Sequence, residues 1–328
     1  MGMPAQKPAN RFLRRPSVSP TSRTSLPAAW RQDAARRSVW SSQTSKTYIL
    51  REPFEPLRIR RMQMASMLFS LILTRTLRWE SRRLRVMLAK RVDGLIVSPA
   101  SSFEVDHLIE ARNMGCPFVL LDRRVPALEA HTVAIDNFPA ARNAVSSFTR
   151  QGHRRIALIS NSRIEGGQKY LTSPVRERLE GYKAALHEAG IRIDPKLTVF
   201  GGGDNENLAR KVRKLCQDDN RPTAFLAVTS AVALVVLSVL REDGLSVPED
   251  VSLICFENAD WTVAVTPPLT VIAQPIKELA SAVTERLIAR LNGGSSLSPE
   301  ETLLSATLIN RGSVKDLSSD LSPDRRSA

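Results

Sequence analysis

The sequence predicts an α/β protein built on parallel sheets that helices cover on both faces. From residue 81 onward, short apolar runs alternate with longer amphipathic segments. A glycine follows the end of several of these segments, as at Gly115, Gly152 and Gly190, and glycine is the residue at which helices commonly stop. When strand and helix segments alternate in this way, right-handed crossovers place the strands parallel in one sheet.

The apolar runs and the turn residues between them give the order of the elements. The expected strands are residues 92–98, 117–121, 131–135, 155–160, 197–200, 223–228, 251–256, 269–273 and 302–310. The expected helices are residues 81–91, 103–114, 137–151, 175–189, 205–216, 231–243 and 276–291. Asn137 is suited to cap the third of these helices, because its side chain can accept a hydrogen bond from a free backbone N–H. We expect residues 315–328 to form a polar tail.

Residues 1–80 are atypical, because they are rich in Arg, Ser and Pro and show no helical or strand period. The whole chain has a net charge of +14, and this first quarter holds 15 basic and 4 acidic residues. Such a basic segment binds nucleic acid or an anionic membrane, or is simply an unstructured tail. The apolar run at residues 67–73 is far shorter than the roughly 20 residues of a membrane-spanning helix. We expect no membrane partner, and without an export signal we expect a cytoplasmic protein.

Residues 81–314 contain, in this order, the strings AKRVDGLIVSP, PFVLLDRRVP, GHRRIALI, RERLEGYKAAL and GLSVPEDVSLICFEN followed by PPLTVIAQP. In their sequence and order these strings resemble the sensor domain of the LacI/GalR family of bacterial transcription regulators. The resemblance implies a two-lobe fold like that of the type I periplasmic binding proteins. It also implies a homodimer that binds operator DNA and a small effector, such as a sugar or related metabolite.

On this basis we expect the first lobe at about residues 81–157 and 275–298, and the second at about 158–274 and 299–314. The family's helix-turn-helix and the first strand and helix of its sensor should precede residue 80, but they are not legible there. We therefore interpret residues 1–80 as disordered or translated out of frame. The first lobe is then incomplete, unless residues 48–50 or residues 66–73 supply a strand.

The resemblance also implies a set of effector-binding residues at the carboxyl ends of the strands. Asp122 follows the strand at residues 117–121, and Arg178 and Ser173 lie at the start of the second lobe's first helix. Arginine offers a rigid fork of donors for hydroxyl, carboxylate or phosphate groups. The alternatives are a turn in which Asp122 pairs with Arg123, and a surface ion pair of Arg178 with Glu177 or Glu180.

Four further residues complete this expected site. Glu257 follows the strand at residues 251–256, where the family usually has Asp, and Gln274 ends the strand at 269–273. Trp261 is suited to stack on a sugar face, although it fits a partly buried loop aromatic equally well. Phe103 is a weaker aromatic candidate.

No catalytic or metal-binding motif is present in the sequence. The cysteines and histidines do not have metal-ligand spacing, and no nucleophile lies in a G-x-S-x-G turn. We therefore expect a DNA-binding regulator that acts as a repressor, with no cofactor and no enzymatic activity. The alternatives are a sugar-binding protein of an uptake system and a truncated sensor that does not bind DNA.

Overall fold

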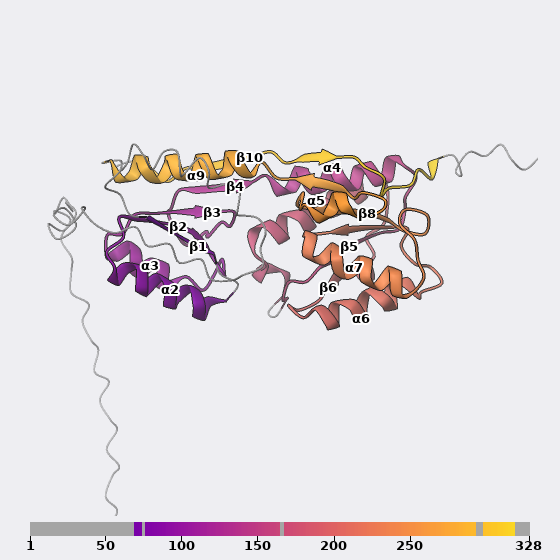
Figure 1. Cartoon of the computed structure of the whole chain (residues 1–328), viewed down its shortest axis with the longest axis horizontal. Helices are drawn as coiled ribbons and strands as arrows, with labels where there is room; N and C mark the ends of the chain where they lie inside the picture. Colours follow the sequence, from indigo (N-terminus) through magenta and orange to yellow (C-terminus); the bar gives the residue numbers. More distant parts are fainter. Residues whose placement is uncertain (1–68, 74–75, 165–166, 293–297, 319–328) are drawn as a thin grey trace, which may run out of the picture.

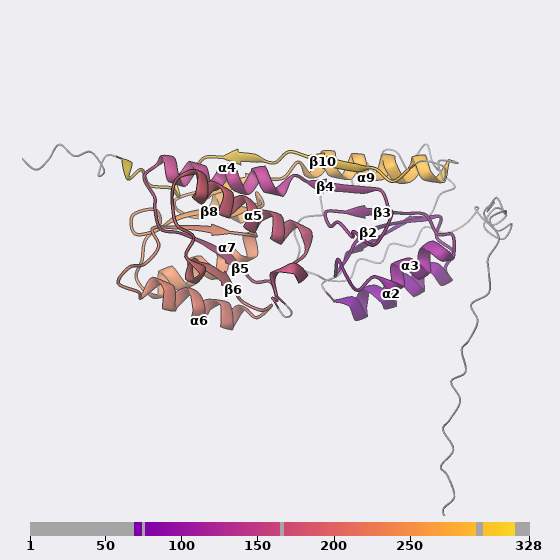
Figure 2. The same ribbon diagram turned by 180° about the vertical axis from the view of Figure 1, so that it is seen from behind.

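The structure is a computed structural model that describes residues 69–73, 76–164, 167–292 and 298–318. Within these residues the chain forms two α/β lobes that lie side by side along the long axis (Figures 1 and 2). The expectation of a disordered or out-of-frame segment falls mainly on residues 1–68, which lie outside the described residues.

The first lobe is a five-stranded parallel sheet in the order β1-β2-β3-β4-β10. Its strands are β1 (Phe69–Leu73), β2 (Gly94–Ser98), β3 (Phe118–Leu121), β4 (Thr132–Ile135) and β10 (Glu301–Leu304). Helices α2 (Leu77–Ala89) and α3 (Asp106–Asn113) cover one face, and α9 (Ile276–Leu291) covers the other (Figure 1). Leu95 and Val97 pack in the α2–α3 core whereas Ile96 packs against α9, so alternate residues of β2 enter opposite cores.

The second lobe is a six-stranded sheet in the order β11-β9-β8-β7-β5-β6, in which β11 runs antiparallel to β9. Its strands are β5 (Ile156–Ser160), β6 (Thr198–Phe200), β7 (Ala224–Ala227), β8 (Ser252–Phe256), β9 (Thr270–Ala273) and β11 (Thr307–Ile309). Helices α4 (Asn137–Arg150) and α5 (Ser173–Glu188) lie on one face. Helices α6 (Asn205–Cys216) and α7 (Ser230–Glu242) lie on the other (Figure 2). Helix α8 (Trp261–Ala264) is a single turn. No helix in the described ranges is long and apolar enough to cross a membrane.

The predicted fold class is confirmed, with differences at the ends of the elements. The candidate strand in residues 66–73 is present as β1, which pairs in parallel with β2. Helix α2 begins at Leu77, four residues before the expected start. The glycines that follow α3, α4 and α5 adopt the positive φ expected of helix stops. The last expected strand is in fact two strands, β10 and β11, which belong to different sheets.

The lobe boundaries also differ from the expected ones. Helix α4 begins at Asn137 and packs against α5, so the second lobe starts about twenty residues earlier than residue 158. Strand β10, which the sequence assigned to the second lobe, joins the first sheet beside β4. Both errors have one cause: a strand that completes one sheet is followed at once by an element of the other lobe. Apolar patterning does not mark such a crossing.

Gly181 sets how closely α5 approaches α4. A Cβ atom built at this position would lie 2.3 Å from the backbone oxygen of Phe138 and 3.1 Å from the Cβ of Ala141. The first distance is well inside van der Waals contact with a backbone atom that cannot rotate away. The two helices can therefore pack at this distance only if residue 181 has no side chain.

We expect the substitution G181A to destabilise the protein by about 2 kcal/mol, because the added methyl group must push α5 away from α4. Urea unfolding followed by circular dichroism measures this loss. The matched control is E180A, which removes an exposed side chain from the same turn of α5. Equal unfolding midpoints for the two variants would contradict the close approach of α4 and α5.

His153 is buried just beyond α4 and links the second lobe to the end of the described chain. Its Nε2 lies 3.1 Å from the carbonyl oxygen of Lys315, and its Nδ1 lies 2.8 Å from Oγ1 of Thr223. A carbonyl oxygen only accepts, so Nε2 carries the proton and Nδ1 accepts from the threonine hydroxyl. Burial lowers the pKa of His153, against the opposing effects of Lys315 and Asp316.

Because the folded protein holds the pKa of His153 below the ordinary value of 6.5, the free energy of unfolding decreases as the pH falls. Above that value both the folded and unfolded chains hold a neutral His153, and its full contribution is present. As the pH falls below it, the unfolded chain binds the proton first and stability is lost. We therefore expect H153Q to show a smaller fall in urea midpoint than the native protein between about pH 7.5 and about pH 5.5. The control H187Q, at an exposed position of α5, should keep the native dependence.

Candidate functional site

The guanidinium of Arg178 lies at the centre of the expected site and is almost fully buried, with 4% of the residue exposed. It projects from the first turns of α5, where Ser173 and Pro174 begin the helix. Its Nε donates to Oδ1 of Asn137 at 2.8 Å, and one terminal nitrogen donates to the carbonyl oxygen of Val228 at 2.6 Å. Its Cζ lies 3.8 Å from the ring centroid of Phe256. The cation is thus held by two neutral acceptors and by the face of an aromatic ring.

Two carboxylates lie near this guanidinium, one from each lobe. Asp122 directly follows β3 and Glu257 directly follows β8. Burial lowers the pKa of Arg178, and the charges of Asp122 and Glu257 act to raise it. Glu257 accepts hydrogen bonds from the backbone N–H and the hydroxyl of Ser230, at the start of α7. The two expected acidic residues and the expected arginine therefore come together.

Asp122 and Glu257 also share an unusual backbone conformation. Their φ angles are 67° and 79°, in the left-handed region that favours glycine. Such a conformation costs on the order of 1 kcal/mol or more in a residue with a side chain, and residues of this kind cluster at binding and catalytic sites. The chain bears this strain at the carboxyl ends of two strands, one in each lobe. That is where ligands bind in open α/β sheets.

A second group of polar residues joins the lobes beside Arg178. Arg124, just after β3, forms ion pairs with Glu177 of α5 and with Glu301 of β10. Its backbone N–H donates to Oγ of Ser173 at 2.8 Å. Burial raises the pKa of Glu177, and Arg124 opposes that rise. The buried hydroxyl of Ser173, expected to contact an effector, is thus used at the junction between the lobes.

The remaining expected residues have no contact with Arg178 among the hydrogen bonds and ring contacts of the described residues. Phe103, in the loop after β2, makes an edge-to-face contact with Tyr170 of the second lobe, with ring centroids 5.3 Å apart. Trp261 begins α8 and packs against the second core. Gln274 follows β9, in the segment that returns to the first lobe. The side chains of Trp261 and Gln274 make no hydrogen bond within the described part of the chain. A role in effector binding stays a prediction for every one of the expected residues.

Sequence reasoning missed two features of this site. Asn137 was interpreted as a helix cap, but its side chain accepts from Arg178 and donates to the carbonyl oxygen of Ile135 at 3.0 Å. The alternative pairing of Arg178 with Glu177 is also wrong, since Glu177 pairs with Arg124. The position of Asn137, two residues after the end of a strand and next to Asp136, was the available signal.

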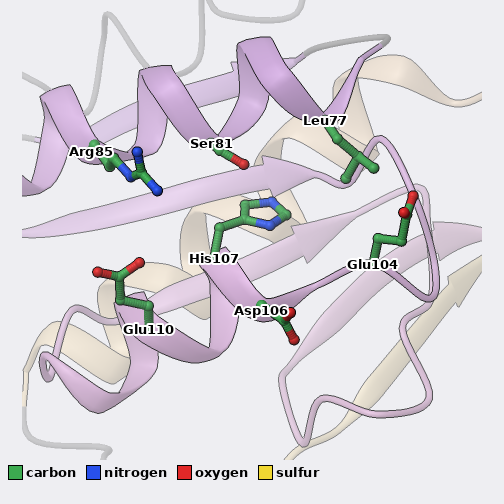
Figure 3. A pocket seen from close by; sticks show the side chains of 7 residues that line it. All are labelled: Leu77, Ser81, Arg85, Glu104, Asp106, His107 and Glu110. Atoms are coloured by element: carbon green, nitrogen blue, oxygen red, sulfur yellow. The ribbon is translucent and has the colours of Figure 1, made fainter.

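One cavity of the described residues lies elsewhere, between α2 and α3 of the first lobe (Figure 3). It has a volume of about 300 Å³. Its lining residues are Leu77, Ser81, Arg85, Glu104, Asp106, His107 and Glu110. The ring of His107 points toward α2, where its Nε2 lies 2.5 Å from the buried carboxylate of Glu80 (Figure 3). None of the expected effector-binding residues lines this cavity.

The described residues also offer little for catalysis. No group of three or more His, Cys, Asp and Glu side chains in these ranges is arranged to hold a metal ion. All three cysteines are free and buried, and burial raises the pKa of Cys116 and of Cys255 to about 12. These thiols are therefore not reactive nucleophiles at neutral pH.

We expect N137A to destabilise the protein by about 2 kcal/mol, because it leaves the buried Nε of Arg178 without its acceptor. Chemical unfolding of the native protein and the variant measures the difference. N113A, at an exposed position near the end of α3, is the control for losing an asparagine side chain. If N137A is as stable as N113A, Asn137 does not hold the buried guanidinium.

Comparison with known proteins gives a consistent result. The family described as "Periplasmic binding protein-like domain" matches residues 145–314. The chain is 63% identical over 180 residues to a "Probable opine utilization operon repressor" of Rhizobium rhizogenes, an alignment that covers 55% of this chain and 91% of the relative. It is 34% identical over 232 residues to the "HTH-type transcriptional repressor CytR" of Escherichia coli K12, covering 71% of this chain and 65% of CytR. It therefore spans about two thirds of the length of CytR.

A solved structure of a transcriptional regulator has a similar fold. The "transcriptional regulator CelR-cellobiose complex" superimposes with a TM-score of 0.63 at 28% identity, and the match covers 72% of this chain and 70% of that one.

Proposed function

The chain belongs to the LacI/GalR family of transcription regulators, and from that premise we propose that it is a repressor whose effector site contains Asp122, Arg178 and Glu257. A small effector bound between the lobes would control the affinity of a homodimer for operator DNA. The relatives named above are transcription regulators and not enzymes. Their function also argues against the alternative that this chain is a sugar-binding protein of an uptake system.

One observation carries this proposal: the buried Arg178 lies near two carboxylates in strained backbone, Asp122 and Glu257, each of which directly follows a strand of a different sheet. These groups supply both donors and acceptors in a partly desolvated setting, which suits a polar, hydroxyl-bearing effector. We propose a sugar or related metabolite. The CelR relative is described in complex with cellobiose, which favours a sugar. The relative at 63% identity is named for opine utilisation, which makes an opine the second candidate.

We expect a panel of sugars and opines to contain a ligand that binds the native protein, and we expect D122N to bind it at least tenfold more weakly. A loss of one charged hydrogen-bonding partner in a desolvated site has about this effect. Calorimetric titration measures the affinities, and the matched control D260N removes an exposed carboxylate before α8. An unchanged affinity in D122N would remove Asp122 from the site.

We expect the full chain to retard a DNA fragment from upstream of its own gene in a gel shift, as a complex with two chains per site. The effector should change the apparent affinity by about 5- to 150-fold, the usual range of allosteric coupling. Sedimentation of the free protein tests the homodimer separately. Effector binding without any retarded DNA would support the alternative of a sensor that does not bind DNA.

A further inference from the structure

A cluster of basic residues lies at the opposite end of the first lobe from the proposed effector site. His131 immediately precedes β4, and Arg286 and Arg290 lie in the last turns of α9. Strands β3 and β4 run parallel to each other. His131, before the start of β4, and Asp122, after the end of β3, therefore lie at opposite ends of the strands. In Figure 1 this is the end of α9 that points away from the second lobe.

His131 carries a buried donor that has no acceptor. The residue is fully buried, and its Nδ1 accepts the backbone N–H of Glu300 at 3.1 Å. A ring nitrogen that accepts carries no proton, so the neutral ring has its proton on Nε2. Nε2 is buried and makes no hydrogen bond in the described structure. Buried polar groups are almost always paired, so an orphaned N–H of this kind needs an explanation.

The two arginines differ in their partners. Arg286 donates to the carboxylate of Glu300 at 2.6 Å and to Oγ1 of Thr302 at 3.3 Å. Arg290 lies one helical turn later, on the same side of α9. Its Nε is buried without a partner, and it forms no ion pair with any described residue. Glu300 thus links His131 to Arg286, while Arg290 keeps an unneutralised guanidinium.

The electrostatics agree with this arrangement. Burial lowers the pKa of His131, and the positive charges of Arg290 and Arg286 lower it further against the effect of Glu300. Burial lowers the pKa of Arg290 as well. The cluster therefore has one excess positive charge and unused donors on two side chains.

We propose that His131 and Arg290, supported by Arg286, form a binding site for a small phosphate-type oxyanion, either inorganic phosphate or the phosphate group of a small monoester. A guanidinium fork matches the spacing of two oxygens of such an anion, and the N–H of His131 supplies a donor to a third. Arg290 is partly exposed whereas His131 is not, so the anion enters on the Arg290 side. The site shares no residue with the proposed effector site. A test of phosphate binding therefore does not depend on whether the proposed function is correct.

Calorimetric titration of the full chain with inorganic phosphate, in chloride buffer of matched ionic strength, tests the proposal. We expect saturable binding of one phosphate per chain, weakened at least tenfold in R290Q. The control K277Q removes an exposed positive charge from the first turn of the same helix and should bind as the native protein does. Equal binding by R290Q and K277Q, or no saturable binding by the native chain, would overturn the site.

Two further measurements identify the type of anion and test the role of His131. Titration with glycerol 3-phosphate identifies the source: tighter binding than that of phosphate points to a monoester, and weaker binding points to the free ion. The ring ¹⁵N resonances of His131 report directly on the second donor. We expect phosphate to shift Nε2 in the native protein and in K277Q, and a spectrum of His131 that phosphate leaves unchanged contradicts its role.

Discussion

The buried guanidinium of Arg178 is the constraint on which the arrangement of this molecule depends. Removing a cation from water costs several kcal/mol, and the cost is acceptable only if the protein replaces the lost hydration. Here the replacement comes from Asn137 at the start of α4, the carbonyl of Val228 after β7 and the ring of Phe256 on β8. Three elements of the second lobe must therefore converge on one side chain, and Asp122 brings the first lobe to the same point.

The packing of α4 on α5 serves this convergence. Gly181 lets the helices approach at their backbones, and Arg178 lies one turn earlier on α5. At that distance Asn137, the first residue of α4, reaches both Arg178 and Glu177. Glu177 then holds Arg124 of the other lobe. A continuous set of contacts thus runs from a helix pair in one lobe to the loop after β3 in the other, beside the proposed effector site.

The sequence predicts most of this fold because apolar alternation and glycine stops are local signals. It also predicts Asp122, Arg178 and Glu257 as neighbours, because the resemblance to the LacI/GalR family implies that all three lie in one effector cleft between the lobes. It does not predict partners that are distant in the chain, such as Arg124 and Glu177, which are 53 residues apart. The sequence pattern places a side chain at the start of a helix but does not show which of several possible partners it binds. For this reason Asn137 was interpreted as a helix cap, whereas its side chain accepts from Arg178. The switch of sheets between β10 and β11 leaves the apolar pattern unbroken and was missed for that reason.

Within the described residues the chain passes between the lobes three times, and each link is short. One residue separates β4 from α4, and two residues separate β9 from α9 and β10 from β11. A residue spans at most about 3.6 Å, so no link can lengthen enough to let the lobes move apart. The lobes can only rotate about these links, which together act as a hinge. Gln274 lies within one of them, so a ligand that contacted this amide would act on the axis of rotation itself.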